Sequence, residues 1–145
     1  MKNHSEQVNC PNFPKQKFSL REHTIELRVR YQETDGQGRL HHANYINYFE
    51  IGRVELFRAG GYCYRELEEQ GIQLVVVEAS CEYFQGAAYD DIVHLTTKVV
   101  KSRGVRIEHL YEARLGDQLI AKGRTVVACI GTNGKAKRLP DFLRL

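Results

Sequence analysis

The order of the periodic segments constrains the fold of this chain most strongly, because one helical segment is followed by four segments with strand patterns. Residues 44–59 repeat apolar side chains at helical spacing, with Asn44 suited to the N-cap and Gly60-Gly61 to the end of the helix. A strand pattern precedes this helix, and a short helical turn at 64–70 follows it. The strand patterns cover residues 23–32, 72–84, 91–102, 105–115 and 118–130.

Short connections between the last three strand segments predict an antiparallel meander. A single apolar helix needs cover, and one antiparallel sheet with an apolar face can curl around it. The sequence therefore predicts an α+β fold in which one long central helix is wrapped by a curved antiparallel sheet of about five strands. The edges of such a sheet stay open, and pairing with a second copy of the chain would cover them.

The size of the chain suits one domain. Its 145 residues can build a core without a metal or disulfides, so we expect a loosely ordered arm at 1–20 and a single domain at 21–145. The net charge of +3 is spread along the chain, which does not indicate nucleic-acid binding. No segment approaches the ~20 apolar residues of a membrane span, and no apolar stretch has signal-peptide length. The four cysteines form no C-x-x-C pair, which favours free thiols in a cytoplasmic protein.

The connection between the first strand and the helix carries a carboxylate, Asp35, and an imidazole, His42. Helix starts offer free backbone N–H groups and the positive end of the helix dipole. A carboxylate that faces such a start, across a gap wide enough for a carbonyl group, suits acyl transfer. On local composition alone, Asp35 could equally be a turn residue, and His41 could face the site in place of His42.

Two segments together resemble a known family. The stretch from Arg28 to Tyr45, with Asp35 and then Gly38 before the helix, resembles the signature of hotdog-fold acyl-CoA thioesterases. The most similar groups are the 4-hydroxybenzoyl-CoA thioesterases and the Tol-Pal-associated thioesterases. Residues 83–91 resemble the family's second marker, an aromatic, a small residue and a paired acid before a strand. The resemblance covers roughly residues 23–130 and implies a hotdog fold, a homo-oligomer (dimer or tetramer) and an active site at the interface between two copies.

The resemblance also implies roles for particular residues. The expected reaction is hydrolysis of an acyl-CoA to free acid and CoA, with Asp35 as general base or as nucleophile. His42 matches a family histidine beside it, and backbone N–H groups of His42 and Ala43 would form the oxyanion hole. Tyr31 matches a family tyrosine, although on the residues alone it is better explained as a packing residue. No metal or separate cofactor is implied, since CoA is part of the substrate, and the acyl group is not specified.

Basic residues near a pocket mouth are expected for a substrate that carries phosphates. Lys101, Arg103 and Arg106 cluster at a turn between two strands and are the expected CoA-binding residues, because arginine binds phosphate in a bidentate manner. Two other functions stay open at this point. One is a thioesterase acting on an acyl carrier protein or polyketide synthase, and the other is a non-catalytic acyl-CoA binding module. The presence of both Asp35 and His42 favours catalysis, because a binding module needs neither.

Overall fold

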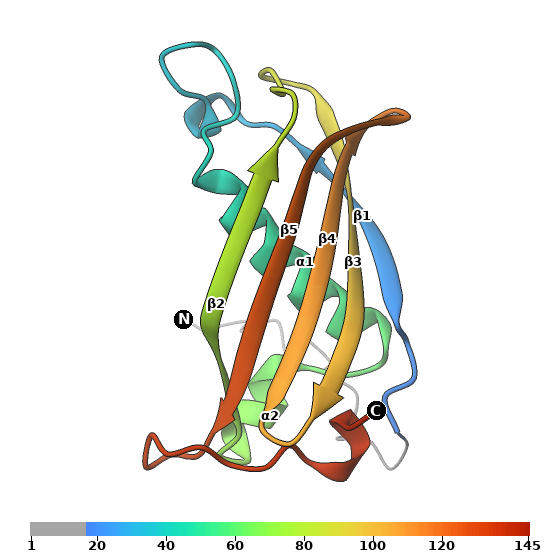
Figure 1. Ribbon diagram of the computed structural model, residues 1–145, viewed down its shortest axis with the longest axis vertical. Coiled ribbons are helices and arrows are strands. Elements are labelled where there is room, and N and C mark those ends of the chain that lie inside the picture. The colour runs from blue at the N-terminus through green and yellow to red at the C-terminus, as the bar shows by residue number, and fades with distance from the viewer. Residues whose placement is uncertain (1–16) are drawn as a thin grey trace, which may run out of the picture.

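One long helix lies against one face of a five-stranded antiparallel sheet in the computed structural model, which describes residues 17–145 (Figure 1). The sheet order is β1-β3-β4-β5-β2, so β1 and β2 form its edges. The helices are α1 (Asn44–Ala59), α2 (Tyr64–Glu69) and the short 3-10 helices η1 (Tyr31–Glu33) and η2 (Asp141–Leu143). The strands are β1 (Glu22–Arg28), β2 (Gln73–Tyr83), β3 (Ile92–Arg103), β4 (Arg106–Leu115) and β5 (Gln118–Ile130). The predicted α+β arrangement and its antiparallel meander are confirmed.

The first strand is shorter than predicted. It ends at Arg28, and residues 31–33 form the 3-10 turn η1 instead of continuing the strand. Glu33 closes this turn, because its backbone N–H donates to the Arg30 carbonyl at 2.9 Å and its Oε1 accepts from the Arg30 N–H at 2.8 Å. Tyr31 therefore leaves the apolar face and is 78% exposed, so its interpretation as a packing residue is wrong for the single chain.

The long helix covers residues 44–59, the range predicted from its periodicity. The predicted N-cap is wrong, however, because Ala43 occupies that position and Asn44 is the first helical residue. The Asn44 side chain donates to the Glu33 carbonyl at 2.8 Å rather than capping its own helix. The start of α1 is thus fixed to the preceding 3-10 turn by a long-range hydrogen bond, which periodicity cannot predict.

The helix packs on the sheet through aromatic side chains. Phe49 has no exposed surface, and its ring stacks on Tyr111 of β4 with centroids 4.2 Å apart. A Cβ at Gly123 of β5 would lie 2.1 Å from the Phe49 ring, so glycine is required there for the helix to approach the sheet. Arg53 of α1 is only 7% exposed despite its charge, because it faces the sheet, where its Nη1 donates to the Tyr111 hydroxyl at 3.1 Å.

The two ends of the described chain meet beside the C-terminal half of α1. Phe18 is buried, and its backbone N–H donates to the Phe142 carbonyl at 2.8 Å. The rest of the predicted N-terminal arm, residues 1–16, lies outside the described residues. No helix among residues 17–145 has both the length and the apolar character needed to cross a membrane.

The cysteines differ from the expectation of free thiols. Cys81 and Cys129 are free, whereas Cys63 is disulfide-bonded, and Cys10 lies outside the described residues. The disulfide removes the argument for a reducing compartment that rested on cysteine usage. The cytoplasmic location therefore stays a prediction.

Candidate active site

The two sequence segments that resembled family markers lie side by side at one end of the sheet. The loop after η1 pairs with itself through the bridge between Thr34 and Leu40. It also pairs with the second marker segment, because Arg39 forms a bridge with Ala88 and the Leu40 N–H donates to the Ala87 carbonyl at 2.7 Å. Residues 34–40, which we call the Asp35 loop, are therefore held from two sides before the chain enters α1.

Asp35 lies at the base of this loop and organises it. Its Oδ1 accepts hydrogen bonds from the backbone N–H groups of Gln37 at 2.9 Å and Arg39 at 3.2 Å. Its own N–H donates to the Arg39 carbonyl at 2.8 Å, which closes the turn. Within the described chain, Oδ2 has no hydrogen-bond donor. The Arg39 N–H bond, assisted by that of Gln37, lowers the pKa of Asp35 below its usual 3.8, so the carboxylate is ionised at neutral pH with one oxygen available.

The backbone N–H groups at the start of α1 are partly bonded within the chain. The Ala43 N–H donates to His41 Nδ1 at 3.1 Å and the Asn44 N–H donates to the His41 carbonyl at 2.9 Å. Among the described residues, the His42 N–H has no acceptor, so it is the predicted oxyanion donor that remains available. In the single chain, no hydrogen bond joins Asp35 to His42 or Ala43.

His41, the alternative to His42, is closely associated with the site. Its positive form would contribute to the lowered pKa of Asp35, although less than the backbone N–H groups do. The imidazole rings of His41 and His42 stack with their centroids 4.2 Å apart, so both lie at the entrance to α1. Since His41 Nδ1 accepts from Ala43, its neutral tautomer carries the proton on Nε2, where it can be donated.

Tyr83 fixes the His42 backbone from the end of β2. Its hydroxyl donates to the His42 carbonyl at 2.9 Å, and its ring packs edge-on against His42 and Tyr45. Burial raises the pKa of Tyr83 to about 12, so its hydroxyl remains a donor at neutral pH and does not act as a base. The aromatic residue of the second marker therefore supports the start of α1.

Glu33 is a buried carboxylate that sequence reasoning missed. It is 8% exposed and accepts from the Tyr48 hydroxyl at 2.9 Å, while its backbone carbonyl accepts from the His41 N–H at 2.8 Å. Burial opposes its ionisation, but the hydrogen bonds from Arg30 and Tyr48 outweigh burial and lower the pKa of Glu33. Glu33 thus anchors the Asp35 loop to α1. The sequence gives no sign of which acid in Glu33-Thr34-Asp35 turns inward.

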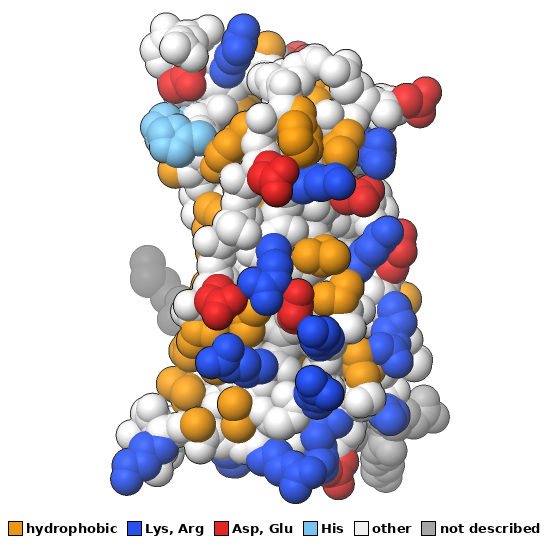
Figure 2. All heavy atoms as spheres, viewed as in Figure 1, with side chains coloured by type: hydrophobic (Ala, Val, Ile, Leu, Met, Phe, Trp, Pro, Cys, Tyr) orange, Lys and Arg blue, Asp and Glu red, His pale blue; other side chains and the backbone are white. Residues whose placement is uncertain are grey.

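Two sets of predicted site residues lie apart from this arrangement. Tyr31 is on η1, where its ring packs edge-on against exposed Tyr89 at 5.7 Å. Lys101, Arg103 and Arg106 lie at the opposite end of β3, where Lys and Arg side chains gather on the lower half of the sheet surface in Figure 2. Arg28 pairs with Ile92, which is the end of β3 nearest the Asp35 loop. At about 3.3 Å per residue, Arg103 at the other end of β3 lies roughly 36 Å from Ile92. One chain does not bring the basic cluster to Asp35.

Comparison with known proteins identifies the family. Residues 29–145 match the family model described as the Thioesterase-like superfamily. The chain belongs to this superfamily. It is 34% identical over 117 residues to the acyl-CoA thioesterase YbgC of Haemophilus influenzae, covering 79% of this chain and 84% of that protein.

Solved structures of the family share the fold. The DHNA-CoA thioesterase of Staphylococcus aureus superposes with a TM-score of 0.79 and 31% identity, covering 81% of this chain and 80% of that one. A 1,4-dihydroxy-2-naphthoyl-CoA thioesterase from Synechocystis has a TM-score of 0.78 at 22% identity, covering 83% and 91%, and supports the fold alone. The predicted hotdog fold and the predicted thioesterase family are confirmed.

Proposed function

We propose that this member of the thioesterase superfamily hydrolyses acyl-CoA esters to a free acid and CoA, with Asp35 as the catalytic carboxylate. The superfamily supports the reaction class, and the relatives named for acyl-CoA and DHNA-CoA support a CoA ester as substrate. The observation that carries the proposal is the Asp35 loop itself. It holds an ionised carboxylate with one available oxygen, and leads directly to the unpaired His42 N–H at the start of α1.

The chemistry follows from these groups. Either water attacks the thioester carbonyl carbon and gives a proton to Asp35, or Asp35 itself attacks and forms a mixed anhydride that water then hydrolyses. In both cases the carbonyl oxygen becomes an oxyanion, the C–S bond breaks and CoA leaves as a thiolate. The His42 N–H would stabilise the oxyanion, joined by the Ala43 N–H once it is released from His41 Nδ1, and a donor of this kind is typically worth about 3–4 kcal/mol in the transition state. A protonated imidazole of His41 or His42 would supply a proton to the leaving sulfur.

A second copy of the chain is part of the proposal. Within residues 17–145 neither β1 nor β2 has a further strand on its outer side, and β2 exposes the apolar run Val75, Val76 and Val77. An exposed apolar edge strand invites pairing with an identical strand. Sedimentation should therefore give a mass of at least twice 16.7 kDa, and a stable, active species of 16.7 kDa would contradict the shared site.

The predicted CoA-binding role of Lys101, Arg103 and Arg106 requires the same assembly. Because this cluster is remote from Asp35 in one chain, it would contact CoA only if a neighbouring chain brought it to the active site. Part of the positive charge of this cluster is already paired, since Arg106 Nη1 lies 3.9 Å from Glu78 Oε1. The assignment therefore stays a prediction that depends on the oligomer.

Release of free thiol from a panel of thioesters tests the proposed function. Aliphatic and aromatic acyl-CoA esters should be compared with the same acyl groups on a carrier protein, at equal concentrations. We expect hydrolysis of at least one CoA ester with a kcat/KM of about 10⁴ M⁻¹s⁻¹ or more, within the ordinary range of enzymes. Turnover restricted to the carrier-bound esters would favour a carrier-protein thioesterase. Tight binding of acyl-CoA without release of thiol would instead indicate a binding module.

A further inference from the structure

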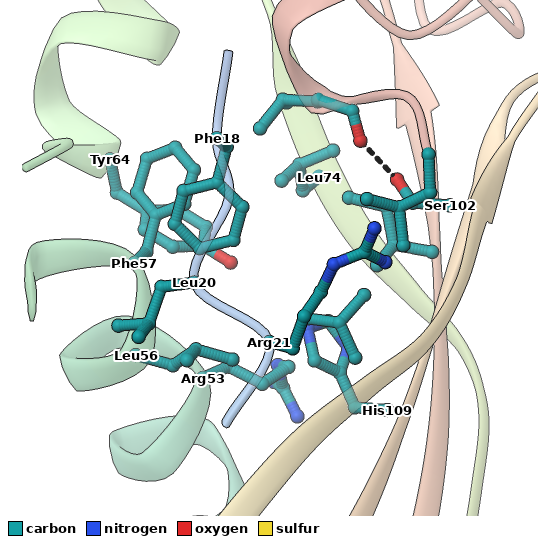
Figure 3. A pocket seen from close by; sticks show the side chains of 14 residues that line it. Phe18, Leu20, Arg21, Arg53, Leu56, Phe57, Tyr64, Leu74, Ser102 and His109 are labelled. Atoms are coloured by element: carbon teal, nitrogen blue, oxygen red, sulfur yellow. Dashed lines mark hydrogen bonds between the residues drawn. The ribbon is translucent and has the colours of Figure 1, made fainter. Parts of the chain in front are cut away.

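A small, partly open cavity lies between α1 and the sheet, away from the Asp35 loop (Figure 3). Its volume is ≈ 20 Å³, and its walls are mainly apolar, with Phe18, Leu56, Phe57 and Ile107 among them. Arg53 comes nine residues after Asn44, the first residue of α1. At about 1.5 Å per residue it therefore lies roughly 14 Å along the helix from the end that adjoins the Asp35 loop. The proposed thioesterase chemistry does not use this cavity.

Arg53 is a buried cation in the wall of this cavity. It is 7% exposed, and its Nη1 donates to the Tyr111 hydroxyl at 3.1 Å. Tyr111 in turn shares a 2.6 Å hydrogen bond with Thr125, so this neutral pair does not balance the charge. Among residues 17–145, no carboxylate lies within ion-pair distance of Arg53. A guanidinium taken out of water without a counter-charge is costly, so buried charges are normally paired.

His109 supplies a second unsatisfied group in the same cavity. It lies on β4, is 5% exposed, and its Nδ1 has no hydrogen-bond partner among the described residues. Figure 3 shows Arg53 reaching from α1 towards His109, while Arg21 enters from the segment that crosses over the cavity. Burial, assisted by the charge of Arg53, lowers the pKa of His109 to about 3, so the ring is neutral at pH 7. A neutral ring with its proton on Nδ1 would donate into the cavity.

We propose that this cavity binds a monovalent anion of about the size of chloride, held by the Arg53 guanidinium and the His109 Nδ1–H. An anion would pair the buried charge and accept from the unpartnered ring nitrogen at the same time. One guanidinium charge is balanced by one negative charge, which favours a monovalent anion. The cavity is large enough for a small ion, since one water needs only about 10–15 Å³.

Bromide, which resembles chloride and scatters anomalously, tests this site directly. Crystals of the full chain grown or soaked in sodium bromide should show an anomalous peak between Arg53 and His109. In solution, the unfolding temperature should rise with sodium chloride relative to sodium gluconate at equal ionic strength. Above the dissociation constant we expect about 3–5 °C for each tenfold increase in chloride. Arg53→Gln should abolish this dependence, while the matched variant Arg106→Gln on the outer face should retain it.

The alternative occupant is an ordered water. An ordinary water peak without anomalous signal, together with equal unfolding temperatures in chloride and gluconate, would overturn the proposal. If Arg53→Gln does not fold, the bromide map and the chloride dependence of the unmodified protein still decide the question. None of these measurements uses thioester hydrolysis, so their outcome is independent of the proposed enzymatic function.

Discussion

Replacing Asp35 by Asn should lower the kcat for acyl-CoA hydrolysis by about 10²–10⁴-fold, the range typical for loss of a general base, and by more if Asp35 is the nucleophile. Asparagine keeps an Oδ1 acceptor for the N–H groups of Gln37 and Arg39, so the Asp35 loop should keep its shape. Only the charge and the reactive oxygen are lost. Thiol release at saturating acyl-CoA measures the effect, and circular dichroism with a CoA-binding assay checks that the fold and the binding survive.

Asp117→Asn is the matched control, because Asp117 is exposed in the turn between β4 and β5. It should leave turnover unchanged. The pH profile offers a second readout: because the pKa of Asp35 lies below 3.8 and the carboxylate must be ionised, kcat/KM should lose activity through this group only below that pH. Near-normal turnover by Asp35→Asn would refute the assigned role.

Co-expression of two inactive chains tests whether the site is shared. Ala43→Pro removes a predicted oxyanion N–H at a position whose φ of −66° suits proline. If Asp35 of one chain works with the α1 start of another, mixed oligomers of Asp35→Asn and Ala43→Pro should recover part of the unmodified activity. No recovery in oligomers shown to contain both chains would place Asp35 and the oxyanion donors in the same subunit.

Phe49→Ala should destabilise the fold by about 3–5 kcal/mol, the usual cost of truncating a buried phenylalanine. Phe49 has no exposed surface and fills the space between Tyr111 and Gly123, where the helix approaches the sheet. The surrounding backbone belongs to central strands that cannot collapse into the void. Urea unfolding at a fixed protein concentration measures the free energy of unfolding.

Ile51→Ala on the same helix is the control, because Ile51 is 40% exposed and its loss should cost far less. Gly123→Ala adds a sharper test. Alone it should be destabilising, since the new Cβ would lie 2.1 Å from the Phe49 ring. Combined with Phe49→Ala it should cost little, because the added methyl group enters vacated space. Strictly additive effects would show that Phe49 does not occupy the space above Gly123.

Local patterns were sufficient to predict the secondary structure. The α1 helix ran from residue 44 to 59 because its apolar repeat and its glycine stop agree, and the alternating segments became β2 to β5 within one or two residues at each end. The exceptions are set by long-range contacts. Glu33 turned the end of the first predicted strand into η1, and the Asn44 side chain bonded to the Glu33 carbonyl instead of capping α1.

The site was only partly predictable for the same reason. Asp35 and the start of α1 could be found because they sit at fixed spacing within one loop. The supporting residues could not, because Glu33, Tyr48 and Tyr83 come together through bonds that span 15 or more residues. The exposure of Tyr31 and the distance of Arg103 from Asp35 likewise follow from tertiary structure. A residue's position next to a motif does not reveal whether its side chain is buried, and basic residues at a turn do not reveal which end of the sheet that turn occupies.

The anchoring by Glu33 gives the connection before α1 a fixed base and an exposed tip. The bonds from Glu33 to Arg30, Tyr48 and Asn44 all lie outside the tip at Gly36, Gln37 and Gly38, which is exposed to solvent. If Asp35 is the catalytic carboxylate, the Gln37 side chain can vary beside it without moving it, whereas Gly38, at a φ of +76°, cannot be exchanged without strain.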